Sequence, residues 1–173
     1  MAPRTDTLDL DSLRLASGEG RRLELDVGIE PVQVGGQRYE IDGGRAPVKL
    51  EVSRTTGSGY ALRLGFGAAL GGPCSRCLGP AVLAIAIEAR EVSLPDGGEE
   101  LESPYVRAGV LDVSAWARDA LVLAMPAQPL CRPGCAGLCP VCGADLNAAG
   151  PDHAHERELD PRWAKLSELR FDD

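Results

Sequence analysis

The feature of this 173-residue sequence that most constrains its fold is the spacing of its six cysteines, which stand in three close pairs. Short gaps between cysteines let one tight turn present two thiolates to the same ion, and Zn²⁺ is the ion that such turns typically hold. The chain has two histidines, and they form a fourth pair of possible ligands just after the third cysteine pair. The candidate metal ligands are therefore Cys74, Cys77, Cys131, Cys135, Cys139, Cys142, His153 and His155.

Eight ligands are the number that two tetrahedral zinc sites require, but the spacing leaves their division open. The ten-residue gap between Cys142 and His153 suits a local site made of Cys139, Cys142, His153 and His155. A second site, joining the tail of the chain to a sheet, would then consist of Cys74, Cys77, Cys131 and Cys135. The simpler alternative is a single compact site made of Cys131, Cys135, Cys139 and Cys142. We accordingly expect one or two Zn²⁺ ions.

Other chemistries of the cysteines fit the sequence less well. A thiol–disulfide redox pair needs a thiolate at a helix N-terminus beside a βαβ unit, whereas Cys74 follows Gly71-Gly72-Pro73 and precedes a predicted strand. Cysteine-rich zinc sites are closed and structural, and the glycine-rich stretches fall in predicted hairpins rather than in a phosphate-binding loop. We therefore expect no catalytic residues and no enzyme.

Alternating apolar residues predict an antiparallel sheet in the N-terminal part of the chain. Such alternation places one set of side chains on one face of a strand. It occurs at Leu23, Leu25, Val27 and Ile29, at Val48, Leu50 and Val52, and at Tyr60, Leu62, Leu64 and Phe66. Residues 81–87 are apolar on both faces, which predicts a central strand. We expect an α+β fold in which this sheet is curled and partly barrel-like.

Helical spacing of apolar residues predicts one helix packed on the sheet over residues 112–125, with Asp112 as its N-cap. We expect a first domain at 1–126 that includes this helix. The second, at 127–173, would be a Cys/His zinc-binding tail built on a zinc knuckle. Asp160-Pro161 has the form of a helix start, so the tail is expected to end in a short helix.

Charge and hydropathy exclude several classes of protein. The formal net charge is −8, which disfavours non-specific binding to nucleic acid, so no DNA partner is expected. The first twenty residues carry acidic side chains and no apolar secretory core, and the longest apolar run is far too short to span a membrane. We expect a cytoplasmic protein without a membrane partner, in a reducing compartment where cysteines favour metal over disulfides.

Three segments resemble a known family. Cys74-Ser-Arg-Cys77-Leu78 is similar to the Cys-x-Arg-Cys-Leu motif of the YceD proteins, the large ribosomal RNA subunit accumulation proteins. The segment from Cys135-Ala-Gly-Leu-Cys139 through Cys142-Gly143-Ala-Asp-Leu-Asn147 resembles their C-terminal signature, and Asp160-Pro-Arg-Trp-Ala-Lys-Leu166 resembles their closing helix. Where many relatives carry Cys-x-Cys, this chain has His153-Ala-His155, an exchange between two kinds of zinc ligand.

The resemblance implies a non-enzymatic factor that supports the accumulation of large-subunit ribosomal RNA and ribosome assembly. Its partner would be that RNA or a basic ribosomal protein. RNA contact by so acidic a chain would rest on local arginines, for which the candidates are Arg76, Arg132, Arg157, Arg162 and Arg170. The alternatives are a thiol–disulfide redox protein and a zinc-stapled adaptor unrelated to ribosomes.

Overall fold

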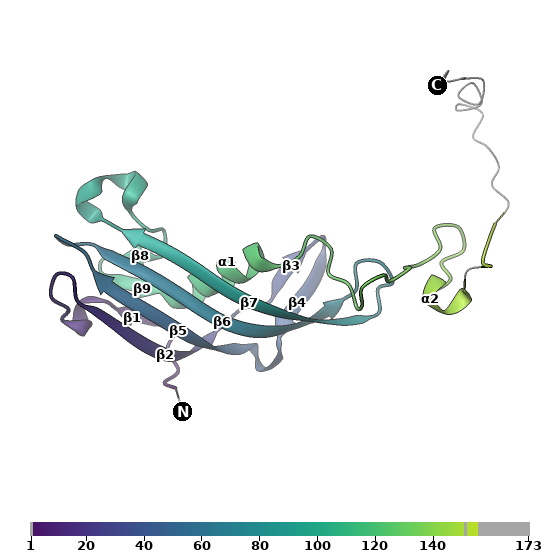
Figure 1. Ribbon diagram of the computed structural model, residues 1–173, viewed down its shortest axis with the longest axis horizontal. Helices are drawn as coiled ribbons and strands as arrows, with labels where there is room; N and C mark the ends of the chain where they lie inside the picture. The colour runs from purple at the N-terminus through teal and green to yellow at the C-terminus, as the bar shows by residue number, and fades with distance from the viewer. Residues whose placement is uncertain (1, 151, 156–173) are drawn as a thin grey trace, which may run out of the picture. The chain divides into compact units, whose positions relative to one another are not determined.

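The computed structural model describes residues 2–150 and 152–155, and the chain divides into two compact units, Met1–Cys135 and Ala136–Asp173 (Figure 1). The strands are β1 (Thr7–Asp9), β2 (Gly20–Gly28), β3 (Val32–Val34), β4 (Gln37–Ile41), β5 (Arg45–Arg54), β6 (Tyr60–Pro73), β7 (Pro80–Ser93), β8 (Val106–Arg107) and β9 (Val110–Asp112). The first unit also contains helix α1 (Val113–Ala124), and the second contains the short helix α2 (Leu146–Ala149). The expected helix from Asp160 lies outside the described residues.

The first unit is built on antiparallel sheets, as the alternation predicted. Six strands form the larger sheet in the order β2-β5-β6-β4-β3, with β7 along the other edge of β6. The long strand β6 therefore pairs with β5 through its first half, with β4 near its end, and with β7 along its whole length. A small second sheet has the order β1-β9-β8.

Two expectations about the sheet are corrected by this pairing. Residues 81–87 belong to β7, which pairs only with β6 among the described residues and so lies at the edge rather than in the centre (Figure 1). Small residues such as Ala84 and Ala86 make this strand look buried in the sequence, although both are exposed. The expected curled, partly barrel-like form is not found either, because no pairing between described residues joins β7 to β2.

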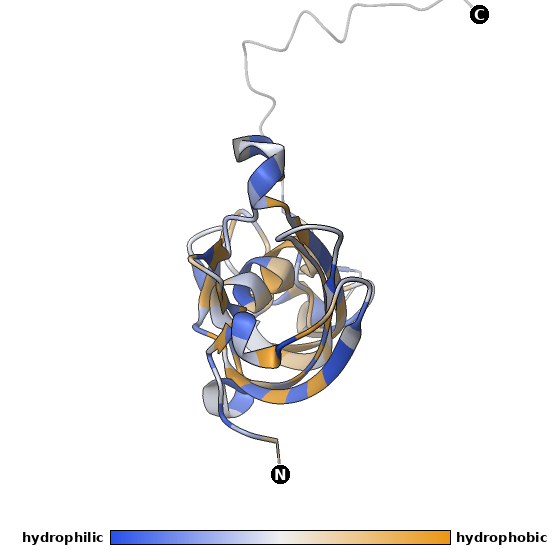
Figure 2. Ribbon diagram, turned by 90° about the vertical axis from the view of Figure 1, so that its left-hand side faces the viewer, coloured by the Kyte–Doolittle hydropathy of each residue, from blue (hydrophilic) through white to orange (hydrophobic). Residues whose placement is uncertain are grey.

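The hydrophobic core lies on one face of the larger sheet, under α1 (Figure 2). Leu50 on β5 stands opposite Leu64 on β6, and both are fully buried. Trp116 and Leu121 of α1 contribute to the same cluster, which confirms the apolar face predicted for the helix. The strands thus alternate between core and solvent along their length, as the two-residue period of a strand requires.

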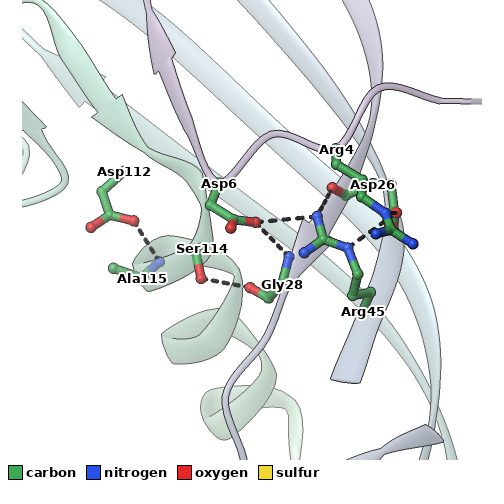
Figure 3. Close-up of polar contacts among 8 residues, drawn as sticks. All are labelled: Arg4, Asp6, Asp26, Gly28, Arg45, Asp112, Ser114 and Ala115. Atoms are coloured by element: carbon green, nitrogen blue, oxygen red, sulfur yellow. Dashed lines mark hydrogen bonds and ion pairs between the residues drawn. The ribbon is translucent and has the colours of Figure 1, made fainter. Parts of the chain in front are cut away.

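The N-terminus of α1 is capped as predicted. The Asp112 carboxylate accepts a hydrogen bond from the Ala115 amide at 2.9 Å (Figure 3). This contact satisfies one of the donors that the first helical turn leaves unpaired. Neither described helix has the length and apolarity needed to cross a membrane.

A polar network ties the N-terminal segment to β2, β5 and α1 (Figure 3). Asp6 Oδ1 accepts from the Gly28 amide at 2.8 Å and from Arg45 Nη2 at 3.3 Å. Arg45 Nε also donates to Asp26 at 3.1 Å, and the Ser114 hydroxyl donates to the Gly28 carbonyl. One aspartate thus joins elements that are far apart in the sequence.

Candidate metal centres

The first cysteine cluster lies in the Met1–Cys135 unit, where the turn between β6 and β7 meets the segment that follows α1. Its members are Cys74, Cys77, Cys131 and Cys135, and their sulfur atoms all lie within 4.8 Å of one another. Cys74 Sγ is 3.8 Å from Cys135 Sγ, and Cys77 Sγ is 3.7 Å from Cys131 Sγ. Four thiolates at the corners of a tetrahedron with Zn–S bonds of 2.3 Å would be about 3.8 Å apart, so the spacing fits a bound zinc ion.

The turn that carries Cys74 and Cys77 has the hydrogen-bond pattern of a metal knuckle. The Leu78 amide donates to the Cys74 carbonyl at 2.9 Å, and the Cys74 amide donates to the Gly79 carbonyl at 2.7 Å. Leu78 adopts a left-handed backbone with φ of 58°, a conformation that glycine normally supplies. The turn adopts this shape although leucine, not glycine, occupies position 78. Its backbone amides are directed toward the cysteine sulfur atoms.

Groups outside the cluster hold its two halves together. Arg76 Nη1 donates to the Cys135 carbonyl at 3.0 Å, and its Nη2 lies 3.4 Å from Gln128 Oε1. The Ser75 amide donates to the Pro129 carbonyl at 2.8 Å. Arg76 is one of the candidate RNA contacts, and in the structure it bridges the two cysteine-bearing segments.

The electrostatics of the cluster favour ionised sulfur at Cys74, whereas the pKa of Cys77 is raised. Hydrogen bonding from the backbone amide of Cys77, assisted by that of Arg76, lowers the pKa of Cys74 to about 6 despite its complete burial. Burial and the neighbouring Cys77 thiol raise the pKa of Cys131 to about 12. Four thiols this close cannot all ionise alone, and a divalent cation would supply the missing positive charge.

The second cluster lies within the Ala136–Asp173 unit. Its members are Cys139, Cys142, His153 and His155, whose candidate ligand atoms again lie within 4.8 Å of one another. Cys142 Sγ is 3.4 Å from His153 Nε2, which is 3.0 Å from His155 Nε2. Two imidazole nitrogens that face each other and two sulfurs form a donor set that suits Zn²⁺.

The knuckle of the second cluster repeats the backbone pattern of the first. The Gly143 amide donates to the Cys139 carbonyl at 2.8 Å, and the Cys139 amide donates to the Ala144 carbonyl at 2.8 Å. Gly143 has φ of 72°, the left-handed conformation expected of the glycine in this motif. Hydrogen bonding from the amides of Cys142 and Val141 lowers the pKa of Cys139 to about 6.

The chain after this knuckle is anchored by residues that the sequence analysis did not assign to the site. Asp145 caps α2 by accepting from the Asn147 amide at 2.9 Å, and the Asn147 side-chain oxygen accepts from the Ala136 amide at 2.9 Å. The Leu146 amide donates to the Gly137 carbonyl at 2.9 Å. Asp145 is a residue type that favours the N-cap position, but the bond between the Asn147 side chain and the Ala136 amide is visible only in the structure.

The structure thus groups the eight predicted ligands into the two sets of four that the ten-residue gap suggested, rather than into the compact set of Cys131, Cys135, Cys139 and Cys142. Each set is closed by cysteine or histidine on all four corners. A donor set of four protein ligands is typical of structural zinc, because a catalytic zinc keeps one position open.

Comparisons with known proteins agree with the sequence motifs. The family model described as "Large ribosomal RNA subunit accumulation protein YceD" matches residues 62–170. Uncharacterized proteins of Mycobacterium tuberculosis and Mycobacterium bovis are each 36% identical over 170 residues, covering 94% of this chain and 81% of the relative. An uncharacterized protein of Mycobacterium leprae is 39% identical over 71 residues, covering 41% of this chain and 32% of the relative. No solved structure matches the chain.

Proposed function

The chain belongs to the YceD family of large ribosomal RNA subunit accumulation proteins, and from this premise we infer that it supports the accumulation of large-subunit ribosomal RNA during ribosome assembly in the cytoplasm. The family match carries this proposal. The proposed mode of action is binding without catalysis, because both candidate metal centres have the closed donor sets of structural sites.

We propose that both clusters hold Zn²⁺ as a structural cofactor. Cys74, Cys77, Cys131 and Cys135 would hold one ion, and Cys139, Cys142, His153 and His155 the other. When bound, zinc supplies a rigid cross-link to segments too rich in glycine and proline to build an apolar core. Arg76 supports this role from the protein side, since it already joins the two halves of the first cluster.

The direct partner is proposed to be large-subunit ribosomal RNA or a basic ribosomal protein. The chain is acidic, with a net charge of −8, and zinc held by four thiolates would add two further negative charges. Because Arg76 donates to the Cys135 carbonyl, it is engaged within the protein. Charge therefore favours a basic protein, and RNA contact would have to be local and selective.

Metal content is the first test. Protein purified without chelator should contain two equivalents of zinc by elemental analysis, and Cys77→Ser with Cys131→Ser should leave one. The thiols should resist alkylation until chelator is added, whereas a redox enzyme would cycle with a thiol reductant. Less than half an equivalent of zinc in freshly reduced protein would refute the metal proposal.

The cellular role is tested by deleting the gene and measuring the ratio of large to small ribosomal subunits. The ratio and the level of large-subunit ribosomal RNA should both fall, and the intact chain should restore them. An unchanged ratio in deleted cells would refute the proposed function. Expression of the Cys77→Ser, Cys131→Ser variant in the same cells then shows whether the first metal centre is needed for the accumulation of large-subunit ribosomal RNA.

The direct partner is tested with purified, zinc-loaded protein. Direct RNA binding requires a preference for large-subunit ribosomal RNA over an unrelated RNA of equal length, with affinity that falls as salt rises. If the protein shows no such preference but binds a purified basic ribosomal protein, the RNA alternative is wrong and the protein alternative stands.

A further inference from the structure

Strand β7 has a long free edge. All fourteen of its residues pair with β6 in one unbroken register, from Tyr60 opposite Ser93 to Pro73 opposite Pro80. No other strand in the described part of the chain pairs with β7. The opposite border of the sheet is partly covered, because the Thr5 amide donates to the Asp26 carbonyl of β2 at 3.1 Å.

The β7 edge lacks several of the features that usually prevent pairing between exposed strands, although it carries the charged residues Glu88, Arg90 and Glu91. Such edges are typically short, bulged, or interrupted by proline or lysine. The register of β7 contains no bulge, its proline is confined to the first position, and it has no lysine. An uninterrupted row of backbone donors and acceptors is available to another strand.

The core beside this edge is incompletely covered. Leu83 and Ile85 of β7 face the core but are only half-buried, and Leu123 of α1 is 86% exposed. A hollow of about 360 Å³ lies between residues 88–91 of β7 and the α1 side chains Trp116, Ala120 and Leu123. An added strand would shield apolar surface that the isolated chain leaves in contact with water.

The charges on β7 are complementary to a second copy of the same strand. Glu88 and Arg90 flank Ala89 and lie on the solvent face of the sheet. Two β7 strands related by a two-fold axis at Ala89 would run antiparallel and place each Glu88 opposite the Arg90 of the other copy. An axis at Glu88 or Arg90 would instead oppose like charges, which is destabilising. Ala89 is also one of the residues that line the hollow.

We propose that β7 pairs with β7 of a second copy of this chain, antiparallel and with the two-fold axis at Ala89, so that the larger sheet continues across a homodimer. Opposite-charge pairs form twice in such an isologous contact, once on each side of the axis. Glu88 already contacts Arg63 of its own chain at 3.1 Å, and its side chain is 72% exposed, so its carboxylate has room for a second partner.

Charge exchange tests this arrangement in the full-length, zinc-loaded protein by sedimentation velocity over a range of concentrations. The wild type should dimerise. Glu88→Arg or Arg90→Glu alone turns both cross-strand pairs into like-charge pairs, which should raise the dissociation constant about tenfold or more. The double variant Glu88→Arg, Arg90→Glu should dimerise again. An equimolar mixture of the two single variants should associate more tightly than either variant alone, because both pairs become attractive.

Glu40→Arg is the matched control, since Glu40 forms an exposed ion pair with Arg38 at 3.0 Å on β4, away from residues 88–90 of β7. It should dimerise like the wild type, and circular dichroism should show that every variant is folded. A wild type that stays monomeric at all concentrations would overturn the proposal. So would a dimer whose affinity the single variants leave unchanged, or a mixture that associates no better than its components.

Discussion

Substitution by alanine is expected to have opposite effects on stability at two glycines of β6, Gly72 and Gly67. Gly72 lies beneath the Tyr39 ring, and a Cβ added there would be 2.2 Å from Tyr39 Cδ1 and 2.6 Å from Cε1, well inside ordinary contact distance. A Cβ added at Gly67 would meet no heavy atom within 4 Å. The same mutation in one strand should therefore destabilise at one position and not at the other.

The size of the effect follows from how Tyr39 is held. Its side chain is 1% exposed, and its hydroxyl donates to the Pro73 carbonyl at 2.9 Å, so the ring cannot move away without losing this bond. Overpacking costs about 1–3 kcal/mol, and a lost buried hydrogen bond adds about 1 kcal/mol. Gly72→Ala should therefore lower the free energy of unfolding by about 2–4 kcal/mol. Gly67→Ala should raise it by about 0.5 kcal/mol, because alanine restricts the unfolded chain more than glycine does.

Urea unfolding followed by the fluorescence of buried Trp116, in a Trp163→Phe background, measures this difference. With a urea dependence of about 2 kcal/mol per molar, Gly72→Ala should lower the midpoint by about 1–2 M. Because Pro73 precedes Cys74, the variant should also lose zinc from the first cluster to a competing chelator sooner than the wild type. Equal midpoints for the two alanine variants would refute the argument from packing.

Three further predictions concern the cap, the N-terminal network and the second candidate metal centre. Asp112→Ala should lower the free energy of unfolding by about 1 kcal/mol, and Asp112→Asn should lower it by less, because asparagine still accepts from the Ala115 amide. Equal losses of stability in urea unfolding would contradict a capping role. Asp6→Ala should cost about 2 kcal/mol in the same assay, since Gly28 and Arg45 both lose a partner; a change below about 0.5 kcal/mol would show that the network adds little. Cys139→Ser with Cys142→Ser should release one zinc and make residues 136–155 sensitive to protease, while the Trp116 unfolding midpoint stays unchanged; a lowered midpoint would mean that the sheet depends on the second centre.

Features that depend on neighbouring residues could be read from the sequence. The alternation of Leu23 to Ile29 and of Tyr60 to Phe66 predicted strands, because side chains of a strand alternate between two faces whatever the strand pairs with. Asp112 predicted the start of α1, because a cap and its donor lie within one turn. The Cys139-to-Gly143 segment likewise predicted a knuckle, whose backbone bonds span only a few residues.

Features that join distant residues were decided by the tertiary structure. The sequence left the division of the eight ligands open, since Cys77 and Cys131 are 54 positions apart and their segments meet only through tertiary contacts such as the bond from the Ser75 amide to the Pro129 carbonyl. The edge position of β7 could not be inferred from its apolar residues, because a run of small side chains has the same pattern beside one neighbour as between two. The role of Arg76 also depended on a remote partner, the Cys135 carbonyl. Spacing along the chain determines which residues can share a turn. The packing of the hydrophobic core determines which turns come together.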